Sequence, residues 1–213
     1  MKADYSLYLV TDRGLSKGRT NMEVVEAAIK GGVTVVQLRE KHSTTREFLD
    51  EALKVREYCL EKNVLFIIND RLDIAQAVDA DGAHLWQDDL PIEYARKLLG
   101  PDKLIGVSAF NETEAVDAEK DGANYLGISP VFTTPTKPEL ETGIGIEGLR
   151  KIRKSVKIPM VGIGGLGSSN AYDVIMAGAD GVAVVSAIVS AIDPQQAASE
   201  IKAEIERARK DLK

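Results

Sequence analysis

The segment Gly122-Ala123-Asn124-Tyr125-Leu126-Gly127 decides the fold, because related segments occur at three other places in the chain. These are Gly32-Val33-Thr34-Val35-Val36-Gln37, Gly82-Ala83-His84-Leu85-Trp86-Gln87 and, more loosely, Gly178-Ala179-Asp180-Gly181-Val182-Ala183. Each predicts a helix that ends at its first glycine, where a left-handed backbone costs little, followed at once by a buried strand. We expect these strands to be the second, fourth, sixth and eighth of one sheet.

Outward from these segments, short apolar runs alternate with longer amphipathic runs along the whole chain. The expected strands span residues 7–10, 34–38, 65–68, 82–86, 104–107, 125–128, 160–162 and 181–184. Expected helices include 22–30, 46–62, 112–121, 170–177 and a last one at 194–213. Thr20 with Glu23, and Thr44 with Glu47, predict capping boxes at two helix starts. Such alternation predicts parallel strands joined by helical crossovers.

A chain of 213 residues holds these eight units economically. A (β/α)8 barrel typically has ~250 residues and sometimes nearer 200. The main alternative is a doubly wound open sheet, which shows the same alternation. No Gly-x-Gly-x-x-Gly follows the first strand, which disfavours a dinucleotide-binding sheet. We expect an α/β protein in which residues 1–213 form a single (β/α)8 TIM barrel domain.

The composition excludes several function classes. The formal net charge of −6 disfavours nucleic acid or an anionic membrane as a partner. The start of the chain is too polar for a signal peptide, and no segment approaches the ~20 apolar residues of a membrane helix. We expect a cytoplasmic protein that acts on small molecules, with a homo-oligomer left open. The single cysteine, Cys59, lies among apolar neighbours and is expected to be a buried hydrophobe, not a nucleophile.

Charged residues follow the second strand, at the barrel end where function collects. Arg39 and Lys41 are two residues apart, and Gln37 alternates onto the same side. Together they could grip a diphosphate, because Arg supplies a planar fork and Lys a point charge. A solvated charged loop is the alternative.

Oxygen ligands follow the third and fourth strands. They are Asn69 and Asp70 after the third, and Asp88 and Asp89 after the fourth. Hard oxygen donors on neighbouring strands suit Mg²⁺, which often takes only one or two protein carboxylates. The alternative for Asp88 or Asp89 is that one of them caps the helix beginning near Pro91.

The remaining strand ends predict a second anion site. Ser108 follows the fifth strand, and the long loop 129–145 with Lys137 follows the sixth. The glycine-rich run 162–167 follows the seventh strand, and a short helix from about Ala187 follows the eighth. Such loops form the usual barrel phosphate site. The residues thus indicate a barrel that handles two phosphorylated small molecules with Mg²⁺.

At these residues the chain resembles the thiamin phosphate synthase family along nearly its whole length. The resemblance is carried by Tyr8 to Asp12, Gln37 to Lys41, Ile68 to Arg71, His84 to Pro91, Gly106 to Ala109, Pro130 to Phe132, Thr134 to Lys137, Gly162 to Leu166 and Gly181 to Ile188. The Gln-Leu-Arg-Glu-Lys, Asn-Asp and Thr-Pro-Thr-Lys segments in this order are the most specific.

The resemblance implies a transferase that joins an aminopyrimidine-methyl diphosphate to a thiazole phosphate, or its carboxylate, through a pyrimidine-stabilised cation. The residues implied to hold the pyrimidine diphosphate are Gln37, Leu38, Arg39, Glu40, Lys41, Asn69, Ser108 and Lys137. Of these, Arg39, Lys41 and Lys137 would stabilise charge, with no protein nucleophile. Asp70 and Asp89 would carry Mg²⁺. The residues implied to hold the thiazole phosphate are Thr134, Pro135, Thr136, Gly165, Val185 and Ser186.

Four positions depart from the family's usual pattern. Trp86 stands where glycine is common, Phe110 where histidine is common, and Ser129 and Thr133 where glycine and proline are common. If the Trp86 ring points into the barrel it narrows the pyrimidine pocket, and if it points outward it packs under a helix.

Two other functions fit the same barrel. A thiazole tautomerase would share the monophosphate site but has no diphosphate to expel, so it would not need the set of Arg39, Lys41, Asp70, Asp89 and Lys137. A non-catalytic sensor of thiamin intermediates is the alternative from another class, and intact Mg²⁺ ligands weigh against it.

Overall fold

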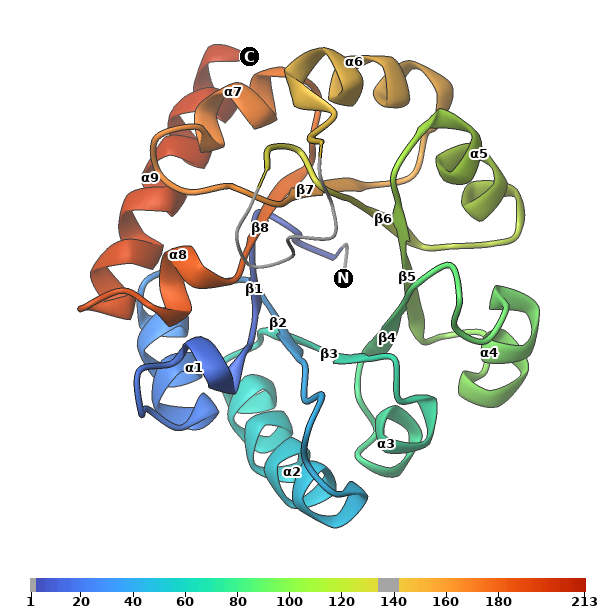
Figure 1. Ribbon diagram of the computed structural model, residues 1–213, viewed down its shortest axis with the longest axis vertical. Helices are drawn as coiled ribbons and strands as arrows, with labels where there is room; N and C mark the ends of the chain where they lie inside the picture. Colours follow the sequence, from blue (N-terminus) through green and yellow to red (C-terminus); the bar gives the residue numbers. More distant parts are fainter. Residues whose placement is uncertain (1–2, 134–141) are drawn as a thin grey trace.

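The computed structural model describes residues 3–133 and 142–213, and its sheet is a closed barrel of eight parallel strands in chain order (Figure 1). The strands are β1 (Leu7–Val10), β2 (Val35–Leu38), β3 (Leu65–Asn69), β4 (Gly82–Leu85), β5 (Leu104–Ala109), β6 (Tyr125–Ile128), β7 (Met160–Ile163) and β8 (Gly181–Val184). β1 pairs with β8, so the sheet has no free edge. The (β/α)8 barrel is confirmed, and the open sheet is excluded.

The helices form a ring around the barrel (Figure 1). They are η1 (Arg13–Leu15), α1 (Asn21–Lys30), α2 (Thr45–Glu61), α3 (Leu72–Ala77), α4 (Ile92–Leu99), α5 (Glu112–Lys120), α6 (Gly145–Ser155), α7 (Ala171–Met176), α8 (Ser186–Val189) and α9 (Pro194–Asp211). Both expected capping boxes are present, on Thr20 and Thr44. The last helix, α9, packs against α1 and α7 and closes the ring.

Alternation along the strands divides the apolar residues into two layers. In β1, Leu7 and Leu9 belong to the layer between the barrel and its helices, whereas Tyr8 and Val10 belong to the barrel interior. Cys59 lies fully buried in the outer layer, as expected, and burial raises the pKa of its thiol to about 12. No helix in residues 3–133 and 142–213 is long and apolar enough to cross a membrane.

A polar side chain precedes each even-numbered strand and links neighbouring strands at the bottom of the barrel, where the strands begin. Its oxygen accepts a hydrogen bond from the backbone N–H near the start of the preceding odd-numbered strand. The pairs are Thr34 with Leu7, Asp81 with Phe66, Asn124 with Ile105, and Asp180 with Met160. Each interaction holds two strands in register at the end opposite to the predicted site.

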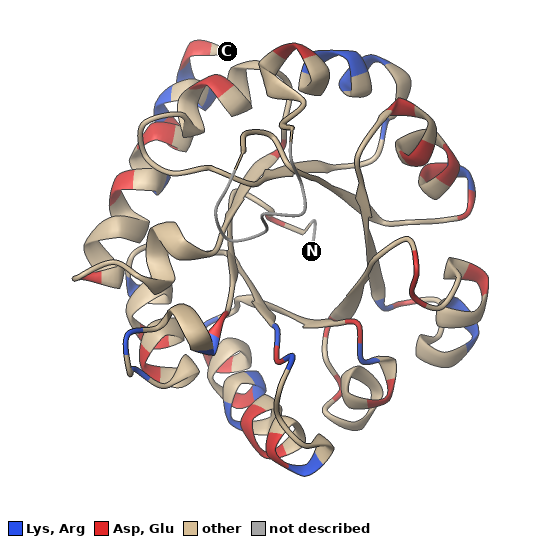
Figure 2. Cartoon of the chain, viewed as in Figure 1, with Lys and Arg blue, Asp and Glu red and all other residues tan. Residues whose placement is uncertain are grey.

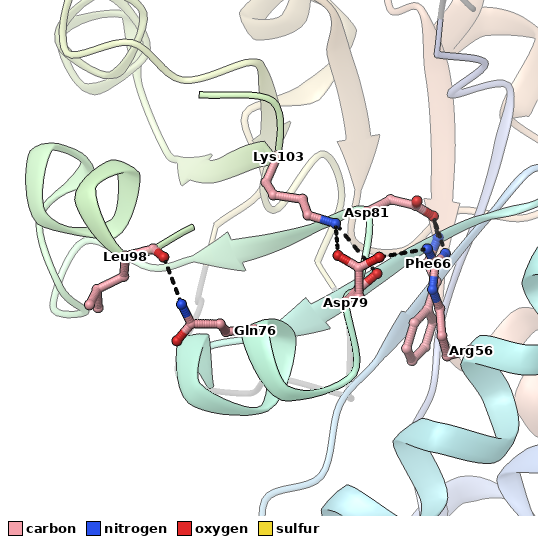
Figure 3. Close-up of polar contacts among 7 residues, drawn as sticks. All are labelled: Arg56, Phe66, Gln76, Asp79, Asp81, Leu98 and Lys103. Carbon is pink, nitrogen blue, oxygen red and sulfur yellow. Dashed lines mark hydrogen bonds and ion pairs between the residues drawn. The ribbon is translucent and has the colours of Figure 1, made fainter. Parts of the chain in front are cut away.

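Figure 3 shows this arrangement at the start of β4. Asp81 Oδ2 accepts from the Phe66 N–H at 2.8 Å and from the Arg56 guanidinium at 3.0 Å. Asp79, two residues earlier, pairs with Lys103 and lies 4.0 Å from the Arg56 guanidinium. Arg56 thus anchors α2 to the bottom of the barrel.

One expected helix cap is corrected. Gly32, Gly122 and Gly178 do adopt left-handed backbones, with φ of 99°, 97° and 100°. Gly82 does not, and Asp79 takes the left-handed position there with φ of 50°. Gly82 belongs to β4, where a Cβ would lie 2.0 Å from the carbonyl oxygen of Leu104. That glycine is required by the close approach of β5, not by a cap.

Candidate functional site

A cavity of about 300 Å³ opens at the C-terminal ends of the strands. It is lined by inward-pointing residues of the strands and by the loops that follow β7 and β8. Several predicted site residues line it, namely Gln37, Arg39, Asn69, Ser108, Gly165, Val185 and Ser186.

The floor of the cavity is a buried chain of hydrogen bonds. Gln37 Nε2 donates to the Tyr8 hydroxyl at 2.8 Å, and that hydroxyl is hydrogen bonded to the Tyr125 hydroxyl at 2.8 Å. His84 continues the chain, with Nδ1 3.2 Å from the Tyr125 hydroxyl and Nε2 2.9 Å from Ser108 Oγ. Burial raises the pKa of both Tyr8 and Tyr125 above the usual range, so both phenols stay neutral. The chain fixes Gln37 and Ser108 on opposite sides of the floor.

Charged residues line the cavity on the side of β1 and β2. Arg39 Nη1 lies 2.9 Å from Asp12 Oδ2, and both side chains are only 22% exposed. The backbone N–H of Arg39 donates to Oγ1 of Thr11, which is fully buried. This hydrogen bond fixes the backbone that carries the guanidinium. Figure 2 shows charged residues on the loops after β2 and β3, while the barrel wall carries little charge. The guanidinium of Arg39 is therefore held in a fixed orientation at this side of the mouth.

Two carboxylates lie beyond Arg39, at the ends of β3 and β4. Asp70, with a left-handed φ of 61°, pairs with Lys41 Nζ at 2.7 Å. Asp89 Oδ2 accepts a hydrogen bond from the backbone N–H of Trp86 at 2.7 Å. Burial raises the pKa of Asp89, the Trp86 N–H opposes that rise, and the negative charge of Asp70 adds to it. The two carboxylates are therefore close enough to repel each other.

The carboxylate pair fits a divalent cation. Asp70 Oδ1 is buried and has no hydrogen-bond partner among the described residues. A cation between Asp70 and Asp89 would satisfy that oxygen and remove the repulsion. No group of three or more His, Cys, Asp or Glu side chains in residues 3–133 and 142–213 is placed to hold a metal. Mg²⁺ needs no such group, because phosphate oxygens and water complete its shell.

The helix-capping alternative for these aspartates is wrong. The N-cap of α4 is Pro91, which has no side-chain capping bond. Asp89 instead closes a turn with Trp86, and Asp88 is exposed.

The opposite side of the cavity is a neutral nest of backbone. Gly164 and Gly165 have φ of 102° and 64°, and a Cβ on Gly165 would lie 2.9 Å from the Thr133 carbonyl oxygen. Val185, Ser186 and the first residues of α8 complete this side. Glycine-rich backbone at the start of a helix, with no carboxylate among the described residues that line this side, suits a phosphate. The helix begins at Ser186, one residue before the expected start.

An aromatic side chain lines the cavity beyond the end of β4 and packs against a second ring. Trp86 follows β4 and lines the cavity, so its ring points inward, as in the first of the two expected orientations. Its ring centroid lies 5.9 Å from that of Phe110, with the planes at 41°. Two of the departures from the family pattern therefore contact each other.

Other predicted residues lie away from the cavity or outside the described residues. Leu38 is buried in the layer between barrel and helices, and Glu40 accepts a hydrogen bond from Asn21 of α1. Lys41 lines a neighbouring depression together with Arg39 and Glu40. Ser129 is buried at the cavity, and Thr133 is exposed. Thr134, Pro135, Thr136 and Lys137 lie outside the described residues.

Four residues of the site escaped prediction as functional residues, namely Asp12, Tyr8, His84 and Tyr125. Tyr8, His84 and Tyr125 lie at inward positions on β1, β4 and β6, and Asp12 lies two residues after the end of β1. The alternation of side chains along each strand identifies them as inward residues. In the expected strands 7–10 and 82–86, Tyr8 is the second residue and His84 is the third. A polar side chain at an inward-facing position of a barrel strand is the signal that could have found them.

Comparison with known proteins agrees with this geometry. A family model described as thiamine monophosphate synthase matches residues 7–188. The chain is similar to a thiamine-phosphate synthase of Chloroflexus aurantiacus, with 55% identity over 200 residues that cover 94% of this chain and 92% of that protein. It is 51% identical over 211 residues to a thiamine-phosphate synthase of Caldanaerobacter subterraneus subsp. tengcongensis, covering 99% of this chain and 98% of that one.

A solved structure gives the same result. The thiamine phosphate pyrophosphorylase from Pyrococcus furiosus superposes with a TM-score of 0.90 and 42% identity, over 97% of this chain and 98% of that one. Sequence similarity, fold and site geometry therefore agree, and the chain belongs to the thiamine monophosphate synthase family.

Proposed function

We propose that this chain is a thiamine-phosphate synthase that transfers a pyrimidinylmethyl group from its diphosphate to a thiazole phosphate or carboxythiazole phosphate. The observation that carries the proposal is the arrangement of the cavity, with a charged side at β1–β4 and a neutral backbone nest at β7–β8. A tautomerase would use only the second. A sensor would not need a carboxylate pair beside the first.

The diphosphate belongs on the charged side. Arg39 is fixed by Asp12 and by the Thr11 hydroxyl, so its guanidinium is oriented before the substrate arrives. Lys41 is held near the same place by Asp70. We assign Gln37, Asn69 and Ser108 to polar contacts along the substrate, because the buried floor fixes two of them and all three line the cavity. Lys137 is assigned to the diphosphate by resemblance.

Asp70 and Asp89 are assigned to Mg²⁺. When bound, the ion would supply positive charge to the departing diphosphate. The chain itself must hold the two carboxylates close together although they repel each other. For Asp89, the backbone N–H of Trp86 does this by donating a hydrogen bond to its carboxylate. We assign Lys41, which pairs with Asp70, to the diphosphate.

The thiazole phosphate is assigned to the nest of Gly165, Val185 and Ser186, with Thr134, Pro135 and Thr136 added by resemblance. In the reaction the C–O bond to the diphosphate breaks, and its electron pair leaves with the diphosphate. The lone pair of the thiazole nitrogen then forms the new C–N bond to the pyrimidinylmethyl carbon. No protein nucleophile is needed, and catalysis rests on positioning and on stabilising the leaving group.

The assignment is tested by two neighbouring aspartates. Asp70→Ala should lower thiamine phosphate formation, measured as fluorescent thiochrome, by at least ~100-fold while thiazole phosphate still binds. Asp88→Ala is the matched control, because Asp88 is an exposed carboxylate one residue from Asp89. It should leave turnover within about twofold of the parent, as surface substitutions usually do. Normal turnover in Asp70→Ala would show that the metal assignment is wrong.

A further inference from the structure

Trp86 occupies the inward position just above β4. Along this strand Ala83 and Leu85 belong to the outer apolar layer, whereas His84 belongs to the cavity floor. Trp86 continues the inward series and lines the cavity. Its indole is the largest side chain among the residues that line the cavity.

The ring is held in place from two sides. Asp89 accepts the Trp86 N–H at 2.7 Å, which fixes the backbone. Phe110 directly follows β5, two residues beyond Ser108, and the centroid of its ring lies 5.9 Å from that of the Trp86 ring. A flat aromatic surface braced in this way loses little conformational freedom when a ligand stacks on it.

The position of the ring relates it to one substrate. The backbone of Trp86 is hydrogen bonded to Asp89, at the charged side, and Trp86 lines the same cavity as the floor residues His84 and Ser108. A ring attached to a diphosphate held at Arg39 and Asp70 would share this cavity with Trp86, because Arg39 and Trp86 both line it. The Trp86 ring offers a π face, which attracts an electron-poor ring and favours a developing cation.

We propose that Trp86, braced by Phe110, is the surface on which the aromatic ring of the diphosphate substrate stacks, and that it sets specificity for that ring. The inference rests on the proposed function. Trp86 forms no bond in the reaction. It contacts the pyrimidine before and after the C–O bond breaks, so its loss weakens ring binding and slows ionisation, and leaves the thiazole phosphate site unchanged.

Trp86 is the only tryptophan in the sequence, so indole fluorescence reports on this part of the cavity alone. Titration of the wild-type protein with pyrimidine diphosphate and Mg²⁺ should quench and shift the emission, because a stacked ring excludes water from the indole. Inorganic diphosphate with Mg²⁺, and thiazole phosphate alone, should change it much less. An equal response to inorganic diphosphate would overturn the proposal.

Three variants provide a second readout. Trp86→Leu keeps apolar volume but removes the π face, and should raise the Kd for pyrimidine diphosphate about 3- to 10-fold with no change for thiazole phosphate. Trp86→Phe keeps a ring and should recover most of that affinity. Tyr94→Leu, the loss of a half-exposed ring on the outside of α4, is the control and should change neither.

The outcomes separate this proposal from the one on which it rests. If the wild-type protein forms thiamine phosphate but Trp86→Leu binds pyrimidine diphosphate as the parent does, only the role of Trp86 is wrong. If the wild-type protein forms no thiamine phosphate, the proposed function itself is wrong.

Discussion

The floor of the cavity makes a quantitative prediction through Tyr125. Its hydroxyl lies between two buried partners, 2.8 Å from the Tyr8 hydroxyl and 3.2 Å from His84 Nδ1. Tyr125 itself is fully buried. Tyr125→Phe removes one oxygen and leaves the ring in place, so packing in the barrel is preserved and the change in stability reports on the hydrogen bonds.

The magnitude follows from the partners left behind. Tyr8 still accepts from Gln37 but loses the partner for its own hydroxyl, and His84 Nδ1 loses its contact with the Tyr125 hydroxyl. A buried polar group left without a partner costs about 1–3 kcal/mol. For the Tyr8 hydroxyl we therefore expect a loss of about 1–3 kcal/mol of unfolding free energy. In a chain of this size that lowers Tm by about 2–12 °C.

Tyr5→Phe is the matched control. Its ring lies 4.8 Å from that of Tyr125, but its hydroxyl makes no hydrogen bond with the described residues. Urea unfolding should show a lower midpoint for Tyr125→Phe with an unchanged slope, and little change for Tyr5→Phe. Turnover should also fall in Tyr125→Phe, since Gln37 and Ser108 lose their common anchor. Equal effects of the two substitutions would refute the reasoning.

Three further predictions come from single residues. Folding raises the pKa of Asp89, so the ionised Asp89 carboxylate destabilises the folded state at any pH above the ordinary Asp pKa of ~4. Asp89→Asn should therefore raise Tm at pH 7, and the increase in Tm should become smaller as the pH falls. The same substitution should abolish metal-dependent turnover. Cys59, with a thiol pKa raised to about 12, should resist a thiol reagent at pH 8 in the folded protein and react once urea unfolds it. Gly165→Ala forces a Cβ to 2.9 Å from the Thr133 carbonyl oxygen at a left-handed φ, and should cost roughly 1–2 kcal/mol and weaken thiazole phosphate binding in calorimetry.

Much of the fold could be predicted because local signals and topology agree. β1, β6 and β8 have the expected bounds, and each capping box lies where expected. The error at Gly82 has a physical cause: glycine serves both left-handed caps and close strand contacts, and a sequence does not distinguish them. Only the paired strand shows which of the two applies.

The site was less predictable, because side-chain direction depends on where a strand ends. The expected fourth strand included Trp86, whereas β4 ends at Leu85, and the inward series nevertheless continues through Trp86. The pairing of Lys41 with Asp70, and of Arg39 with Asp12, links strand ends that are distant in sequence. Such contacts follow from barrel closure and not from any local pattern.

The central claim is that one cavity joins two phosphorylated substrates with the help of a divalent cation. The most direct test incubates the purified wild-type protein with pyrimidine diphosphate, thiazole phosphate and Mg²⁺, and measures thiamine phosphate as thiochrome together with released diphosphate. We predict equal amounts of both products, and neither of them when a chelator is present. Folded protein that binds thiazole phosphate but releases no diphosphate with Mg²⁺ would contradict the account.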